Sequence, residues 1–247
     1  MLTKAQIKHL QGLKLKKYRQ NYADFVIEGE KLVTEALLEN VYPDLFIATT
    51  EWLTQHRGML PEGIQVVEAT LAEIEKISSL STPQPVMALV KKREISESDL
   101  QVVNKWVLAL DGISDPGNMG TILRTADWFG IDTVLCSHDC VELYNPKVVQ
   151  STMGAIFRMQ VCYLDLAHYL KKTKMPVVGA VLGGESLHDH TFGRSGILVI
   201  GSESHGISPE VLAATTHQVT IPAYGRSESL NAAIATGIIL HQIRLKS

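Results

Sequence analysis

Three short stretches of this chain place glycines, prolines and isolated polar side chains directly after apolar runs. They are DGISDPGNMGTILR at 111–124, LVIGSESHGIS at 198–208 and VTIPAYGRSESLNAAIATG at 219–237. The glycines and prolines predict sharp turns, and the residues after them predict helix starts. Amides, a carboxylate and a guanidinium at such turns have the chemistry to position a reacting group or to stabilise negative charge.

The first stretch resembles a phosphate-binding turn but lacks the residues that known nucleotide motifs require. No Gly-Lys-Ser/Thr follows it, so it is not a P-loop, and its glycines at 112, 117 and 120 do not match GxGxxG. Asn118 lies near the predicted helix start and Arg124 about two turns further on. An N-terminal helix cap and a surface arginine are the alternative interpretation.

The second and third stretches carry polar residues at positions typical of functional sites. Gly201 lets the backbone approach a ligand closely, and Glu203 follows a buried strand. A carboxylate that only stabilises the helix beginning near residue 208 is the alternative. In the third stretch a capping box from Ser227 would need Glu or Gln where Leu230 stands. The start of the last helix is therefore predicted from Ser227, Ser229 and Asn231.

Strands and helices alternate along both halves of the chain. Residues 3–20 predict a basic helix capped by Thr3, and the strand-like runs FVIEG, DLFIATT, IQVVEAT and PVMALVKK then predict a small α/β sandwich. From NKWVLALDGI onward, continuous apolar runs alternate with helices, which is typical of a parallel sheet covered on both faces. Ligands of such sheets bind beyond the carboxyl ends of the strands. The pattern alone predicts a doubly wound open sheet.

Charge and composition limit the partners. The 247 residues have a net charge of −3, with 45% hydrophobic and 20% charged residues, as in ordinary globular proteins. Residues 1–20 contain no acid, so they form a local basic patch that either binds a phosphate backbone or is simply a solvated helix face. The basic residues of this segment are Lys4, Lys8, Lys14, Lys16, Lys17 and Arg19.

The cysteines and the hydropathy pattern indicate a cytoplasmic protein. Cys136, Cys140 and Cys162 are too few for a disulfide framework, which favours a reducing compartment. No secretory h-region and no run of about 18 apolar residues occurs, so we expect no membrane association. CSHDC at 136–140 lacks a second cysteine pair, and HDH at 188–190 is interpreted as a surface loop, so no metal is expected.

In their order and spacing the three stretches resemble the three motifs of the SpoU/TrmH family of RNA 2′-O-ribose methyltransferases, in the SPOUT superfamily. The resemblance covers about residues 104–244 and includes the intermediate segment NPKVVQSTMGAIFRMQV. FVIEGEKLVTEAL and PVMALV are similar to the family's substrate-binding domain, which resembles ribosomal protein L30e. The matching residues are 115–120 with 124–126, 200–203 with 206–208, and 221–222 with 228–231.

The resemblance implies an architecture that the pattern rules do not give. It implies an L30e-like substrate-binding domain at 1–95, a linker at 96–103 within a polar region, and a SPOUT α/β domain at 104–247 with a parallel sheet. It further implies a deep C-terminal trefoil knot and a homodimer with active sites at the subunit interface. General rules of topology instead treat knots as essentially absent.

The resemblance also implies the reaction and its residues. S-adenosylmethionine would give its methyl group to a ribose 2′-OH of structured RNA, with ribosomal RNA favoured over transfer RNA. The motif-one arginine, Arg124, would act as base or stabilise the alkoxide. The implied catalytic and positioning residues are Arg124, Asn118, Glu203, Ser229 and Asn231; cofactor binding falls to Gly201, Ile221, Leu230 and Val181, and RNA contacts to Lys14, Lys16, Lys17 and Arg19.

Other classes of protein are less consistent with these residues. A non-catalytic RNA-binding protein would not need all the polar residues of the three motifs. A Rossmann-type methyltransferase or dehydrogenase would need its glycine fingerprint and an acidic residue about 20 positions further on. The motifs depart from the family pattern at Ser204-His205 and in SLNAAIA, where SLNVSVA is common, but neither departure removes a proposed catalytic side chain.

Overall fold

The computed structural model describes residues 1–246, which form two compact units. The first comprises Met1–Arg93 and Tyr144–Phe157, and the second comprises Glu94–Leu143 and Arg158–Ser247. The chain therefore passes between the units three times. Segment 144–157 packs with the first unit, where the Tyr144 ring lies 4.6 Å from that of Phe25 and its hydroxyl donates to Arg93 O at 2.7 Å. The domain boundaries 1–95, 96–103 and 104–247 stay a prediction.

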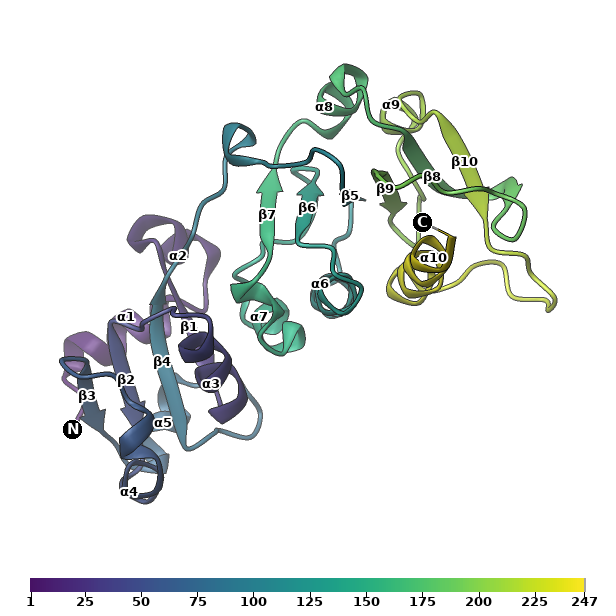
Figure 1. Ribbon diagram of the computed structural model, residues 1–247. Coiled ribbons are helices and arrows are strands. Elements are labelled where there is room, and N and C mark those ends of the chain that lie inside the picture. The colour runs from purple at the N-terminus through teal and green to yellow at the C-terminus, as the bar shows by residue number, and fades with distance from the viewer. Residues whose placement is uncertain (247) are drawn as a thin grey trace. The chain divides into compact units, whose positions relative to one another are not determined.

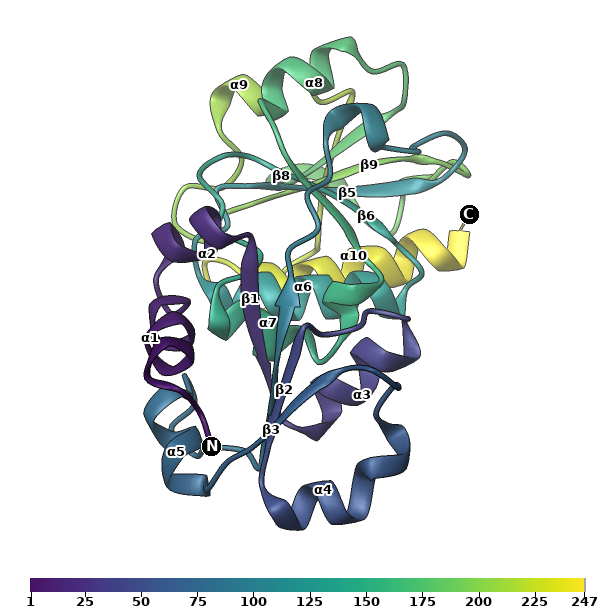
Figure 2. The ribbon, with the colours of Figure 1, turned by 90° about the vertical axis from the view of Figure 1, so that its left-hand side faces the viewer.

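The first unit is an α/β sandwich built on a four-stranded sheet of order β1-β4-β2-β3. Only β2 and β3 run parallel; β4 is antiparallel to β1 and to β2. In Figure 2, α1 and α5 cover one side of this sheet and α3 the other. Its elements are α1 (Lys4–Gly12), α2 (Lys16–Tyr22), β1 (Asp24–Glu28), α3 (Glu30–Leu38), β2 (Leu45–Ala48), α4 (Thr50–His56), η1 (Arg57–Met59), β3 (Gln65–Glu68), α5 (Leu71–Ile77), β4 (Val86–Lys91), α7 (Pro146–Thr152) and η3 (Ala155–Phe157).

The second unit contains a six-stranded sheet of order β10-β8-β9-β5-β6-β7, in which every strand pair is parallel. Both views place α8 and α9 on one face and α6 and α10 on the other (Figure 1 and Figure 2). Its elements are η2 (Glu97–Asp99), β5 (Trp106–Asp111), α6 (Pro116–Trp128), β6 (Thr133–Cys136), β7 (Gln160–Tyr163), α8 (Leu166–Lys172), β8 (Val177–Ser186), β9 (Gly196–Gly201), α9 (Pro209–Leu212), β10 (His217–Thr220) and α10 (Ala232–Lys246).

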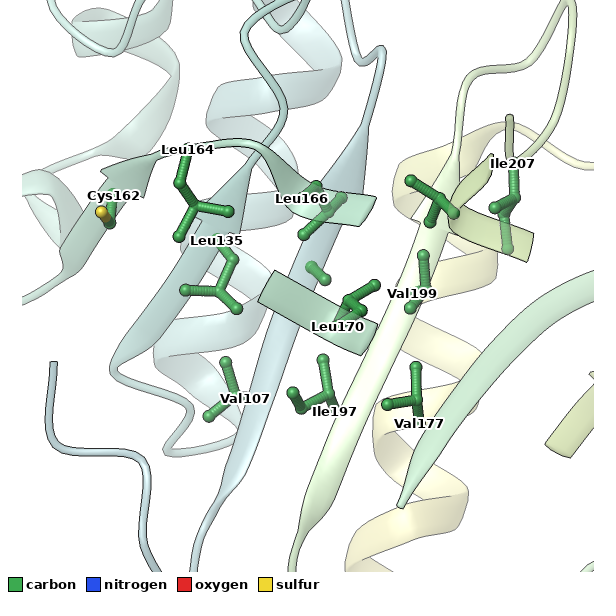
Figure 3. Packing of buried hydrophobic residues seen from close by; sticks show 12 residues of the cluster. Val107, Leu135, Cys162, Leu164, Leu166, Leu170, Val177, Ile197, Val199 and Ile207 are labelled. Carbon is green, nitrogen blue, oxygen red and sulfur yellow. The ribbon is translucent and has the colours of Figure 1, made fainter. Parts of the chain in front are cut away.

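Cover on both faces explains the apolar strand runs. All six residues of β5 are buried, and alternate residues contribute to opposite faces of the sheet. Figure 3 shows one of these faces, where Leu166 and Leu170 of α8 pack over Val107 of β5 and Ile197 of β9. Complete burial of such side chains stabilises the unit by about 1.5–3 kcal/mol each. The predicted parallel α/β sheet is confirmed; the threading of a knot stays a prediction.

Helix ends near the site follow from local sequence. Asp115 caps α6, because its side chain accepts from Asn118 N at 2.8 Å and Pro116 occupies the first turn. The last helix begins at Ala232, later than Ser227, and Asn231 caps it by accepting from Ala233 N at 3.0 Å. Within residues 1–246, no helix is long and apolar enough to span a membrane.

The basic N-terminal segment forms two helices where one was predicted. Thr3 caps α1 in a capping box, as expected, but the chain leaves the helix after Gly12 and resumes it at Lys16. Leu13, in the break, is buried in the core of the unit. Arg19 is also buried, and its Nη1 donates to Leu13 O at 2.7 Å. The guanidinium thus satisfies a backbone carbonyl that the break leaves outside the helix.

Replacement of Arg19 by Ala should lower the free energy of unfolding by about 1–3 kcal/mol, because a buried carbonyl loses a charged donor. Urea unfolding followed by circular dichroism measures the change. Lys17→Ala is the matched control, since Lys17 is exposed on the same helix, and should shift stability by less than about 0.5 kcal/mol. Equal stability of both variants would contradict this structural role.

Candidate functional site

The three polar stretches meet at the carboxyl ends of neighbouring strands. β5 and β9 are adjacent, and their last residues, Asp111 and Gly201, are register partners. Each of these strands is followed by one of the turns singled out in the sequence. The third turn leads from β10 into α10, which packs beside α6. Parallel strands have all their carboxyl ends on one edge, so distant stretches of sequence share one site.

A hydrogen-bonded cluster of three side chains connects these turns. Asn118 Nδ2 donates to Glu203 Oε1. Asn231 Nδ2 donates to Asn118 Oδ1 at 2.9 Å and to Glu203 Oε1 at 3.3 Å. The same carboxylate oxygen accepts from Ala232 N at 3.3 Å. One residue from each stretch therefore contributes to a single polar cluster.

The helix starts explain why these particular residue types meet. Asn118 lies in the first turn of α6, and Asn231 is the cap of α10. A carboxylate beside the N-terminus of the fifteen-residue α10 interacts favourably with the unpaired N–H groups and the helix dipole. Glu203 thus lies at the start of α10 and not at the helix near residue 208 that was its alternative interpretation, and its side chain is exposed within the cluster.

The second turn is narrow, and Gly201 is the residue that permits it. A Cβ built on Gly201 would lie 2.1 Å from the carbonyl carbon of Gly206. Ser202 N donates to Gly206 O at 3.1 Å, and Gly206 N donates to Ser202 O at 2.8 Å. The close approach that requires glycine is therefore made by the chain's own loop, which holds Glu203 at the site.

Two supporting residues were missed in the sequence. Asp111 is buried, and its Oδ2 accepts from Ser208 N at 2.7 Å, which joins the first turn to the second. Ser137, after β6, accepts from Gly112 N at 2.9 Å, where Gly112 has a positive φ of 70°. An acidic residue at the end of an otherwise apolar strand was the available signal for Asp111. Ser137 had no comparable signal.

Two buried thiols lie behind the first turn. Cys140 Sγ donates to Leu110 O at 3.3 Å. Hydrogen bonds with Cys136 and Ser137 lower the pKa of Cys140 to about 7, whereas the hydrogen bond with Cys140 and burial raise the pKa of Cys136. Because the pKa of Cys140 is lowered and that of Cys136 is raised, this pair of thiols loses its first proton more readily than its second. Both thiols are buried, so they support the turn from inside the unit.

Arg124 and Ser229 remain outside the cluster. Arg124 is exposed on α6, and within residues 1–246 it forms no hydrogen bond or ion pair. Ser229 is exposed before α10, and across the same part of the chain its hydroxyl has no hydrogen-bond partner. The structure thus brings Asn118, Glu203 and Asn231 together and leaves these two side chains open to a substrate.

The residues predicted to bind a cofactor lie on adjacent strands. Gly201 ends β9, Val181 lies in β8, and Ile221 directly follows β10. In the sheet, β8 lies between β9 and β10. The pairing of β8 with β10 jumps from Gly179 to Glu185, so residues 180–184 with Val181 leave the regular ladder. Leu230 is 45% exposed in the third turn. These positions border one edge of the sheet, and cofactor binding there stays a prediction.

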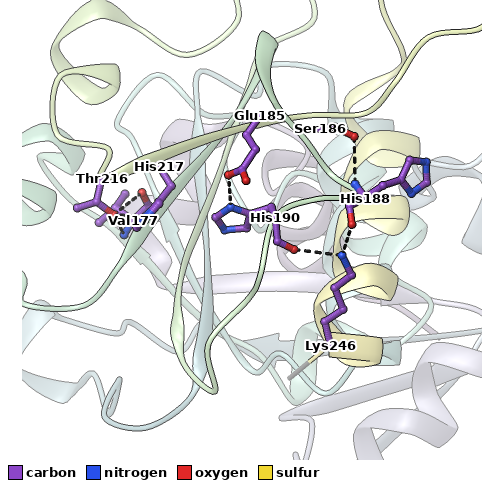
Figure 4. Close-up of polar contacts among 8 residues, drawn as sticks. All are labelled: Val177, Glu185, Ser186, His188, His190, Thr216, His217 and Lys246. Carbon is purple, nitrogen blue, oxygen red and sulfur yellow. Dashed lines mark hydrogen bonds and ion pairs between the residues drawn. The ribbon is translucent and has the colours of Figure 1, made fainter.

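The histidines of the HDH segment anchor the end of α10. His190 is buried with its Nδ1 2.6 Å from Glu185 Oε2, and Lys246 Nζ donates to the backbone oxygens of His188 and His190 (Figure 4). His217 lies nearby, its ring centroid 5.4 Å from that of His190. Within residues 1–246, no group of three or more His, Cys, Asp or Glu is placed to hold a metal ion.

The four residues predicted to bind RNA differ in their exposure to solvent. Lys16 and Lys17 are exposed at the start of α2. Lys14 is exposed, but its Nζ donates to Ser78 O at 2.6 Å. Arg19 is buried within the unit, which argues against its direct contact with RNA.

Comparison with known families assigns both parts of the chain. The SpoU rRNA Methylase family matches residues 105–241, more than half of the chain, and the MRM3-like substrate binding domain matches residues 4–88. The chain belongs to the SpoU rRNA methylase family. The predicted resemblance to this family is confirmed, and all three polar turns lie within the matched residues.

Individual relatives extend over nearly the whole chain. The 23S rRNA (guanosine(2553)-2′-O)-methyltransferase RlmP of Bacillus subtilis is 31% identical over 97% of this chain and 96% of its own length. A solved structure from Porphyromonas gingivalis, described as an RNA methyltransferase of the TrmH family, is 41% identical with a TM-score of 0.88, and each chain is covered completely. An AdoMet-bound rRNA methyltransferase from Sinorhizobium meliloti is 28% identical with a TM-score of 0.89, over 99% of this chain and 96% of that one.

Replacement of Gly201 by Ala should destabilise the second unit by about 1–3 kcal/mol, because the new Cβ cannot fit against Gly206 without moving the loop. Urea unfolding measures the loss, and hydrogen exchange should be faster at the Ser202 and Gly206 amides. Gly58→Ala is the control, since a Cβ there has no atom within 4 Å. Unchanged exchange in Gly201→Ala would show that the loop tolerates the side chain.

Proposed function

We propose that this protein transfers the methyl group of S-adenosylmethionine to a ribose 2′-OH in ribosomal RNA. The observation that carries the proposal is the convergence of Asn118, Glu203 and Asn231, one from each family motif, at the carboxyl edge of a parallel sheet. The 2′-O-methyltransferase activity of the Bacillus subtilis relative supports the reaction, and the AdoMet bound to the Sinorhizobium meliloti relative supports the methyl donor. The MRM3-like substrate-binding match supports an RNA-binding role for the first unit.

The reaction is a displacement at the methyl carbon of a sulfonium ion. The 2′-oxygen forms the new C–O bond, the C–S bond breaks with its electron pair going to sulfur, and S-adenosylhomocysteine leaves. The hydroxyl proton must pass to a base, because the hydroxyl is a weak nucleophile. The protein must therefore align hydroxyl and methyl closely and stabilise the charge that develops on the oxygen.

The cluster and Arg124 divide these tasks. The cluster carries an amide from each helix start and the exposed carboxylate of Glu203, which supports a positioning role toward the ribose. Arg124 stabilises the developing negative charge, because its guanidinium carries a delocalised positive charge and offers several N–H donors. Proton removal by Arg124, assisted by a substrate phosphate, is the alternative role. Ser229 is assigned to substrate positioning with them.

The methyl donor is assigned to the same edge of the sheet. Gly201, Ile221, Leu230 and Val181 offer backbone groups and apolar surface, which suit an adenosine whose binding depends on close approach more than on charge. The sulfonium activates its own methyl group, so the proposed reaction has no step that calls for a metal.

Arg124→Ala should lower kcat for methyl transfer by about a hundredfold or more, because the transition state loses its charge stabilisation. Affinity for S-adenosylmethionine should stay unchanged. Transfer of a labelled methyl group to RNA measures the first quantity and isothermal titration calorimetry the second. Arg194→Ala, an exposed arginine before β9, is the control and should keep full turnover.

Unchanged turnover in Arg124→Ala would overturn the role of this residue. Absence of methyl transfer by the parent protein to any RNA would overturn the proposed function itself. Mapping of 2′-O-methyl sites in cells with and without the gene then identifies the RNA, and sites confined to transfer RNA would favour the alternative substrate. A cytoplasmic location is part of the proposal, supported by three buried free cysteines.

We also propose a homodimer formed through α6 and α10. The two helices lie side by side, with Arg244 Nε donating to Phe129 O at 2.7 Å. Their outer surface exposes 85% of Trp128, 56% of Ile234 and 38% of Ile238. A second copy of the chain would cover this apolar surface and would border Arg124, which lies one helical turn before Trp128.

The double variant Ile234→Glu/Ile238→Glu should raise the dimer dissociation constant by about a hundredfold or more, because the interface would bury unpaired charge. Analytical ultracentrifugation measures the change. Leu38→Glu, which changes an exposed leucine of the first unit, is the control and should leave the dimer intact. A parent protein that is monomeric at micromolar concentration would contradict the proposal.

A further inference from the structure

Two tyrosines of α2 form an exposed aromatic surface that the proposed chemistry does not use. Tyr18 and Tyr22 are 40% and 51% exposed. Their rings are parallel within 8°, with centroids 6.3 Å apart. Residues at i and i+4 of a helix share a face, so the rings lie beside each other on one surface.

Neighbouring groups hold both rings in place. A Cβ built on Gly12 would lie 3.3 Å from Tyr18 Cγ, so the glycine lets this ring lie directly against the end of α1. The His9 ring meets Tyr22 edge-on at 4.6 Å and 82°. His9 Nε2 in turn lies 3.1 Å from Asp24 Oδ2, a buried carboxylate that Lys91 also contacts at 2.6 Å. Rings that are already ordered lose little conformational entropy on binding.

The charge around the rings matches a nucleic-acid strand. Residues 1–20 carry no acid. Lys16 and Lys17 are exposed and, among residues 1–246, form no hydrogen bond or ion pair. The nearest acid in sequence, Asp24, is occupied by Lys91 and His9. Parallel aromatic faces beside free ammonium groups are the arrangement that binds single-stranded RNA, through stacked bases and paired phosphates.

We propose that Tyr18 and Tyr22 stack unpaired bases of the RNA substrate, while Lys16 and Lys17 hold adjacent phosphates. The proposal rests on the RNA methyltransferase function and specifies the form of its substrate: a single-stranded segment lies on α2. Arg19, on the same short helix, has no part in this contact because its guanidinium is buried. Stacking tolerates different bases, so this surface adds affinity and position and leaves the choice of nucleotide to the methyl-transfer site.

The test uses the full chain and labelled RNA in fluorescence anisotropy. The probes are oligouridylate and oligoadenylate single strands and a blunt RNA duplex of equal length. Tyr18→Ala/Tyr22→Ala should weaken single-strand binding about fivefold or more for each base that loses its stacking partner, with duplex binding unchanged. Tyr18→Phe/Tyr22→Phe should bind like the parent, because it keeps both ring faces. Tyr42→Ala, an exposed tyrosine outside the basic segment, is the matched control.

Salt dependence separates the stacking role from the ionic one. The tyrosine variants should keep the parent slope of log affinity against log salt. Lys16→Gln/Lys17→Gln should reduce that slope by roughly 0.7 for each phosphate of a single strand that no longer pairs with a lysine. Equal urea midpoints of the Phe and Ala variants confirm that both are folded.

Three results would overturn the proposal: parent-like single-strand binding by the Ala pair, an equally weakened Phe pair, or no single-strand binding by the parent. The methyl-transfer assay with Arg124→Ala reads the proposed function separately. A protein that binds single strands through the tyrosines but transfers no methyl group would refute only the function. A protein that methylates RNA without tyrosine dependence would refute only this inference.

Discussion

One carboxylate oxygen, Glu203 Oε1, accepts hydrogen bonds from N–H groups of three residues that lie far from it in the sequence. Asn118 reaches it from the start of α6, and Asn231 and Ala232 from the start of α10. Local caps set where α6 and α10 begin, and the Glu203 carboxylate joins the two helix starts through charge-assisted hydrogen bonds. The geometry of the proposed methyl-transfer site depends on this oxygen.

The strand order of the second sheet brings the turns that carry these residues close together. Because β5 and β9 are parallel neighbours, Asp111 and Gly201 end side by side, and the turns after them lie within hydrogen-bond reach. Gly201 allows the second turn to fold back on Gly206, which directs Glu203 toward α6 and α10. Helices cover both faces of the sheet, with α8 and α9 on one side and α6 and α10 on the other, and this packing supports the strand ends from which the turns leave.

The first unit supplies binding surface with a different composition. Its basic segment combines lysines that are exposed to solvent with tyrosines that are packed in fixed orientations. The proposed contacts with RNA have two physical origins: the ionic part should weaken with salt, and the stacking part should not. The proposed roles of the two units therefore differ: the basic segment of the first would hold a flexible strand, and the motif turns of the second would act at one nucleotide.

The sequence by itself determined the fold class and the family, and it singled out three residues that the structure brings into one cluster. Uninterrupted apolar runs predicted a parallel sheet covered on both faces, because only strands buried on both sides need no polar face, and the three motifs predicted the family. The tertiary structure decided which residues that are distant in the sequence contact one another, which sequence patterns do not specify. Asn118, Glu203 and Asn231 meet because strand order brings separate turns together, and Asp111 supports them through a contact spanning 97 residues. The break after Gly12, the burial of Arg19 and the packing of segment 144–157 with the first unit likewise depend on which surfaces are covered. A local sequence pattern shows the type and spacing of residues, whereas the packing of the whole chain determines which residues contact each other.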